Sequence, residues 1–80
     1  MESFIIDGDG IENWFDDEGA FEIDDLMRDG RYSVQEIFSG IEVSFDGNDY
    51  SYDDIDYIID TLVYSAEQYG VGRVDSRSTY

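Results

Sequence analysis

Adjacent carboxylates are the side chains of this sequence that could do chemistry. Pairs of acids occur at Asp16/Asp17, Asp24/Asp25 and Asp53/Asp54, and two carboxylates can serve as general acid and general base, as in glycosidases. The surrounding sequence frames no cleft, and eighty residues scarcely hold a sugar-sized pocket beside a core. Histidine and cysteine are absent, which removes the commonest general base and every thiolate ligand. We therefore expect a protein that is not an enzyme, with no catalytic residue and no cofactor.

Two short acidic segments with glycine, residues 7–10 and residues 46–49, invite comparison with calcium-binding loops. If Gly10 were the sixth residue of such a loop, Ile5 would stand at the first ligand position and Glu12 at the normally apolar eighth. The second segment likewise does not fit the pattern of a calcium-binding loop. We expect turns with solvated carboxylates and no specific metal site.

Net charge is the extreme property of this chain. It contains 21 acidic residues against four arginines, with no lysine, which gives a net charge of −17. Nucleic-acid phosphates and anionic membrane surfaces need basic partners, so direct binding to either is excluded. No stretch is apolar enough to span a bilayer, and the acidic N-terminus lacks the pattern of a signal peptide. A soluble cytoplasmic protein is expected.

The most regular segment is residues 53–70, which we predict to be a long amphipathic helix. Asp53 is expected to be its N-cap and Gly70 to end it. The apolar residues of this segment follow the helical spacing i, i+3, i+4, i+7: Ile55, Ile58, Ile59, Leu62, Val63 and Ala66. The opposite face carries acids together with Tyr57 and Tyr64.

The remaining segments have weaker patterns. Residues 11–15 suggest one or two helical turns, and residues 20–28 favour a short helix over a strand. A capping-box pattern at residues 33–36 predicts another short helix, although alternation permits a strand. Residues 41–45 alternate like a strand, and residues 46–48 predict a hairpin turn that returns through a strand over residues 49–52.

The expected fold class is therefore α+β, with short helices and a β-hairpin packed against one long C-terminal amphipathic helix. Residues 1–70 would form a single acidic globular domain, and residues 71–80 a flexible C-terminal tail, frayed or available for pairing. The tryptophan and four of the phenylalanines are expected in the core: Trp14, Phe15, Phe21, Phe38 and Phe45.

The acidic surface is the main functional signal. A solvated helix normally mixes charge signs, whereas residues 30–70 contain one cation, Arg31. Duplex DNA carries one charge per about 1.7 Å, so 17 net charges match roughly 29 Å of duplex. The expected partner-binding residues are the tyrosines and acids of the long helix, the hairpin acids and two further clusters: Asp53, Asp54, Asp56, Tyr57, Asp60, Tyr64, Glu67, Asp46, Asp49, Asp16, Asp17, Glu18, Asp24 and Asp25.

In charge, size and aromatic content, the chain resembles the small, highly acidic phage-encoded proteins that mimic DNA. That class includes inhibitors of restriction enzymes, of uracil-DNA glycosylase, of CRISPR effectors and of the nucleoid protein HU. Its members share no common fold, so the resemblance implies a mode of action: binding to the DNA-binding surface of a basic host protein in the bacterial cytoplasm. A homodimer would double the acidic surface. Two other interpretations stay open, an acidic protein-interaction module without DNA mimicry and a halophile protein with a solvating acidic surface.

Overall fold

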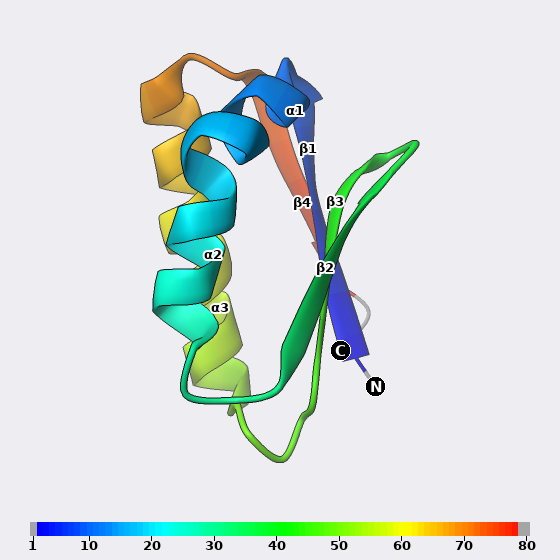
Figure 1. Cartoon of the computed structure of the whole chain (residues 1–80), viewed down its shortest axis with the longest axis vertical. Helices are drawn as coiled ribbons and strands as arrows, with labels where there is room; N and C mark the ends of the chain where they lie inside the picture. Colours follow the sequence, from blue (N-terminus) through cyan, green and yellow to red (C-terminus); the bar gives the residue numbers. More distant parts are fainter. Residues whose placement is uncertain (1, 79–80) are drawn as a thin grey trace.

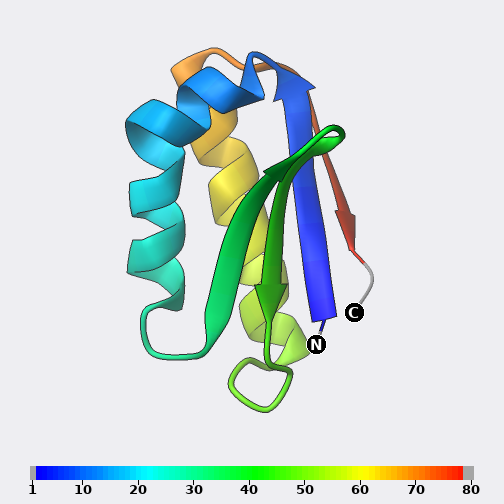
Figure 2. The same ribbon diagram turned by 45° about the vertical axis from the view of Figure 1, so that its right-hand side comes forward.

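The computed structural model describes residues 2–78, which form two layers (Figures 1 and 2). One layer is an antiparallel sheet with strand order β2-β3-β1-β4, and the helices all lie on one face of it. This confirms the α+β class. Along the chain the elements are β1 (Glu2–Asp9), α1 (Ile11–Trp14), the π-helix η1 (Phe15–Gly19), α2 (Ala20–Met27), β2 (Tyr32–Ile37), β3 (Gly40–Phe45), α3 (Tyr52–Tyr69) and β4 (Gly72–Ser78).

The core lies between the two layers. Successive side chains of a strand point to opposite faces, and the inward residues of the central strands, such as Phe4, Ile6, Val43 and Phe45, are fully or almost fully buried. Phe4 and Ile6 therefore belong to a central strand, in a short apolar run that the sequence permits to be either extended or loosely packed. No helix within residues 2–78 is both long and apolar enough to cross a membrane.

The predicted long helix is present as α3, and its apolar stripe faces the sheet. The buried residues of α3 are Ile55, Ile58, Ile59, Leu62 and Ala66. Its N-cap is Ser51, and the prediction of Asp53 is wrong. The Asp54 backbone N–H donates to the Ser51 side chain at 3.1 Å, while the Asp54 carboxylate accepts from the Ser51 N–H at 3.2 Å. This reciprocal capping box fixes the first turn.

A second helical segment of similar length precedes the sheet hairpin. Helices α1, η1 and α2 run continuously through residues 11–27, against 18 residues in α3. Within η1 the Ala20 N–H bonds to the Phe15 carbonyl, the i→i−5 bond of a π-turn. A Cβ at Gly19 would lie 2.8 Å from the Trp14 ring, so glycine permits this packing. The expectation of one dominant C-terminal helix is corrected, since α3 has a comparable partner and is followed by β4.

The short helix predicted around residues 33–38 is a strand. β2 pairs with β3, with Val34 opposite Val43, and their hairpin turns at residues 38–39 instead of residues 46–48. Gly40 has φ +130°, and a Cβ there would collide with the Ile6 carbonyl oxygen, so this residue begins β3 and does not end a helix. The core predictions fail for Phe38 and Phe21, which are 108% and 83% exposed.

The strand predicted over residues 49–52 is absent from the described chain. The connection between β3 and α3 buries Tyr50, whose hydroxyl donates to the Met27 carbonyl and whose ring packs edge-on to Phe45. At the other end, residues Gly72–Ser78 pair with β1 as β4, which corrects the expectation of a flexible tail for these residues. Residues 79–80 lie outside the described part.

Candidate protein-binding surface on the helical layer

Carboxylates are concentrated in the helical layer. The helices contain twelve of the 21 acids, and within the described chain none of the four arginines lies in a helix. The twelve are Glu12, Asp16, Asp17, Glu18, Glu22, Asp24, Asp25, Asp53, Asp54, Asp56, Asp60 and Glu67. All are exposed except Glu22, which is half-buried. One side of the molecule therefore holds most of its negative charge.

Helix α3 presents two different flanks beside its buried stripe. At about 100° per residue, four predicted site acids share one side of this helix, which we call the acidic flank: Asp53, Asp56, Asp60 and Glu67. The other flank faces the residue 11–27 segment and is aromatic and polar. Tyr57 and Tyr64 lie there, 65% and 63% exposed. Each tyrosine also lies three or four residues from acids of its own helix, Tyr57 from Asp53 and Asp60 and Tyr64 from Asp60 and Glu67.

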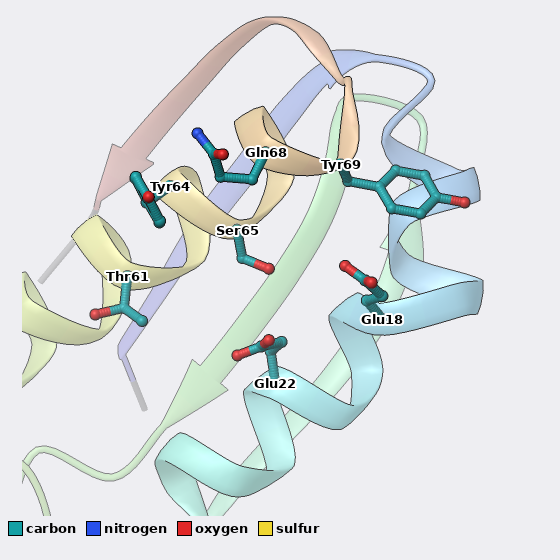
Figure 3. Close-up of a pocket in the computed structure, with 7 residues that line it drawn as sticks. All are labelled: Glu18, Glu22, Thr61, Tyr64, Ser65, Gln68 and Tyr69. Atoms are coloured by element: carbon teal, nitrogen blue, oxygen red, sulfur yellow. The ribbon is translucent and has the colours of Figure 1, made fainter.

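A hollow of about 500 Å³ lies between the two helical segments, and we call it the Glu22 hollow (Figure 3). It is lined by Glu18, Glu22, Thr61, Tyr64, Ser65, Gln68 and Tyr69. The carboxylates of Glu18 and Glu22 project towards α3 from the facing segment (Figure 3). Tyr64 therefore lines the same hollow as two acids that lie far from it in the sequence.

Hydrogen bonds hold the wall of the Glu22 hollow. The Trp14 indole N–H donates to Ser65 Oγ at 3.2 Å, which ties α1 to α3. The Tyr69 hydroxyl donates to Asp17 at 3.0 Å, and this bond, helped by partial burial, raises the pKa of Tyr69. Among residues 2–78, the carboxylates of Glu18 and Glu22 make no hydrogen bond and no ion pair. These two carboxylates therefore remain able to bind a cation, at a wall whose side chains are held in place by hydrogen bonds.

A smaller hollow of about 240 Å³ lies at the other end of the same helix pair. Its lining is Leu26, Asp29, Asp49, Tyr50, Asp54, Tyr57 and Ile58. The two predicted tyrosines, Tyr57 and Tyr64, therefore each border a hollow between the helices. Asp54 also lies here, held in the capping box of α3.

Asp46 and Asp49 are arranged differently from the other predicted acids. Arg31 Nη2 lies 3.0 Å from Asp46, and Arg31 Nε lies 2.9 Å from Asp49. Hydrogen bonds from the Arg31 side chain and backbone lower the pKa of Asp49. These acids flank the connection to α3, not a hairpin tip as predicted, and the two of them share one cation, Arg31.

The five predicted acids of the residue 11–27 segment divide into two groups. Asp24 accepts a hydrogen bond from the Tyr32 hydroxyl at 2.6 Å, and Asp25 pairs with Arg28 at 2.7 Å. Asp16, Asp17 and Glu18 are consecutive residues of the π-turn and all are exposed.

Five of the seven residues that line the Glu22 hollow were missed by sequence reasoning: Glu22, Thr61, Ser65, Gln68 and Tyr69. The available signal was helical spacing, since Glu22 follows Glu18 by four residues and Gln68 follows Tyr64 by four. Spacing alone does not reveal which helices face each other, so the hollow could not be derived from it.

The molecule is thus a two-layer α+β protein with an acidic helical layer. No group of three or more acidic side chains suited to holding a metal ion occurs within the part of the chain that the structure describes. Comparisons with protein-family models, with curated proteins and with solved structures find no match for this chain. The functional argument therefore rests on the molecule's own surface.

Proposed function

We propose that the protein is a non-enzymatic DNA mimic that occupies the positively charged DNA-binding surface of a bacterial host protein in the cytoplasm. Nucleoid protein HU and restriction, CRISPR or repair factors are the candidate targets. The observation that carries this proposal is the segregation of twelve carboxylates, without any arginine, on the two helical segments. A surface of one charge sign is complementary to a surface that binds phosphates.

The charge density supports the proposal. The longest extent of the molecule is 33 Å and its net charge is −17, or one net charge per about 1.9 Å. Duplex DNA has one per about 1.7 Å. Helix α3 has 18 residues, which at 1.5 Å per residue gives a rigid rod of about 27 Å. Carboxylates on rigid helices can meet a row of lysines and arginines with little ordering cost.

The uneven distribution favours mimicry over a solvating acidic surface. A chain adapted to concentrated salt needs acids on all of its faces, whereas here the open face of the sheet mixes signs and neutral residues. Glu42, Ile5 and Arg77 lie next to one another across that face. Gln35 and three serines also occupy its outward positions. The negative field is thus directed to one side.

The test is capture of partners by the tagged protein from bacterial lysate at low salt, with excess duplex DNA as competitor in a parallel sample. We expect one dominant basic DNA-binding protein that elutes with salt and is displaced by DNA. A broad set of basic proteins would indicate ion exchange and contradict the proposal. A single partner that ignores DNA would indicate an acidic interaction module instead.

A matched pair of variants then locates the surface. Asp60→Asn combined with Glu67→Gln removes two charges from the acidic flank, whereas Glu36→Gln combined with Asp75→Asn removes two from the sheet strands. We expect the first pair to weaken binding of the captured partner by about tenfold or more, because charge-assisted contacts contribute about 1.5–3 kcal/mol each. The second pair should change it by about twofold or less. Equal effects would contradict the assignment to the helical layer.

A further inference from the structure

The Glu22 hollow combines charge that this chain cannot neutralise with an aromatic wall. Glu18 and Glu22 make no ion pair within residues 2–78, and the sequence has no lysine. Three of the four arginines pair elsewhere: Arg28 with Asp25, Arg31 with Asp46 and Asp49, and Arg73 with Asp9. Arg77 donates to the Ser39 carbonyl across the sheet. A cation for this hollow must come from another molecule.

The wall of the hollow suits one kind of cation. Tyr64 exposes 63% of its surface, and the Tyr69 ring is fixed by its bond to Asp17. Two tyrosines and two carboxylates that line the same hollow can offer stacking together with charge-assisted hydrogen bonds. A guanidinium uses both, because it is planar, stacks on aromatic rings and presents a fork of N–H donors to carboxylates. An ammonium is a more strongly hydrated point charge and gains less from the rings.

The hollow has both the size and the access for such a side chain. It is an open depression, and its volume of about 500 Å³ exceeds what one guanidinium occupies. The half-buried Glu22 lies on the facing segment and projects towards Ser65 (Figure 3). A guanidinium entering between the segments would meet both carboxylates from one side and the tyrosines from the other.

We propose that the Glu22 hollow receives an arginine side chain of the partner protein. This inference rests on the proposed function, because it assigns the anchor through which a basic partner is recognised. The acidic flank supplies the long-range field, whereas the hollow supplies the contact that distinguishes one basic surface from another.

The test uses N-acetyl-arginine amide as the probe, with no partner protein present. Two-dimensional ¹H–¹⁵N NMR at about 150 mM salt follows the titration, and N-acetyl-lysine amide is the comparison compound. We expect saturable shifts confined to residues 18–22 and 61–69, with the arginine compound binding several-fold more tightly than lysine. Shifts spread over all the acids without saturation would overturn the proposal.

Matched variants separate this hollow from general attraction. Glu22→Gln should weaken arginine-amide binding by about tenfold, and Tyr64→Leu by about threefold. Asp60→Asn removes the same charge from the acidic flank and should leave it within about twofold. The spectra themselves report whether each variant is folded. If Glu22→Gln and Asp60→Asn have equal effects, the hollow is not an arginine site.

The two proposals can fail separately. A captured partner that DNA displaces, but that binds Glu22→Gln and wild type equally, would sustain DNA mimicry and overturn the arginine anchor. Confined, saturable binding of the arginine amide without any DNA-displaceable partner would sustain the anchor chemistry and overturn the mimicry.

Discussion

The helical layer and the sheet differ in how their carboxylates meet cations. In β4 and in the connections, arginines lie against acids: Arg73 is 2.6 Å from Asp9, and Arg31 bridges Asp46 and Asp49. In the helices there is no arginine, and the nearest, Arg28, follows α2 and reaches Asp25. The same chain therefore offsets part of its negative charge with arginines in one region and leaves the acids without arginines in the other.

This difference shows where the stability of each region originates. Like charges four residues apart on a helix, as at Glu18 and Glu22, are destabilising by about 0.2–0.5 kcal/mol per pair. The helical layer must therefore be stabilised by its buried side, where Trp14, Ile23 and Leu62 are fully buried. Acids retained against this repulsion are consistent with a use for the field outside the molecule.

The largest loss of stability is expected on removal of Trp14, the buried side chain that anchors the helical layer. Trp14→Ala should lower the free energy of unfolding by about 3–5 kcal/mol, because it leaves a cavity and removes the bond to Ser65. Urea denaturation followed by circular dichroism measures the change. Trp14→Phe, which keeps an aromatic ring but no N–H, should cost clearly less. A loss below about 1 kcal/mol for the alanine variant would show that Trp14 does not anchor this layer.

An intermediate effect is expected where charge is balanced. Arg31→Gln leaves Asp46 and Asp49 without their cation and should lower the melting temperature more than Arg28→Gln, which affects one exposed pair. Thermal melts at neutral pH and low salt compare the two variants. Equal melting temperatures would show that the pairs of Arg31 with Asp46 and Asp49 stabilise the fold no more than the exposed Arg28–Asp25 pair does.

Acid should abolish the contribution of the Arg31–Asp49 pair. Because the folded pKa of Asp49 lies below the usual value of 3.8, the pair stabilises the fold fully above that value. The contribution is lost as the pH falls through the lowered pKa. The difference in melting temperature between wild type and Asp49→Asn should hold at pH values well above 3.8 and shrink progressively as the pH is lowered through and below that value. A difference that does not shrink on acidification would mean that the substitution disturbs packing instead of removing an ion pair.

The smallest effect has the opposite sign. Asp60→Asn removes a like charge four residues from Asp56 and should raise stability by about 0.2–0.5 kcal/mol at low ionic strength. The gain should disappear near 1 M salt, where the screening length is about 3 Å. Glu36→Gln on β2 serves as the control and should show a smaller change. Destabilisation by Asp60→Asn at low salt would indicate a structural role for this carboxylate.

The long helix could be predicted because its apolar spacing is local information. Its N-cap was misplaced by two residues because Asp53 and Ser51 are both good caps. The structure uses Ser51, because its side chain and its backbone N–H both form hydrogen bonds with Asp54. The sequence of residues 33–36 also matches a capping box, yet these residues belong to a strand that pairs with β3. Strand pairing depends on residues that a local pattern does not include.

For the candidate site, the sequence placed the tyrosines and acids on the right helix but not beside their neighbours. Tyr57 and Tyr64 were expected among the acids of α3, and they also border hollows that this helix forms with neighbouring segments, which the sequence did not indicate. Asp46 and Asp49 were expected at a free tip and instead surround Arg31. Helical phase can be read from sequence, whereas the packing of one helix against another is a tertiary property.

The π-turn at Phe15–Gly19 amounts to an inserted residue. Ile11 and Met27 are sixteen positions apart, so a regular helix would place them about 160° apart and could not bury both. With one residue fewer between them, this angle would be about 60°. The π-turn accommodates the additional residue, so both side chains can face the core. The residues that fill it are Asp16, Asp17 and Glu18. The extra residue therefore adds a carboxylate to the outer surface, while Ile11 and Met27 at the two ends of the segment both remain buried.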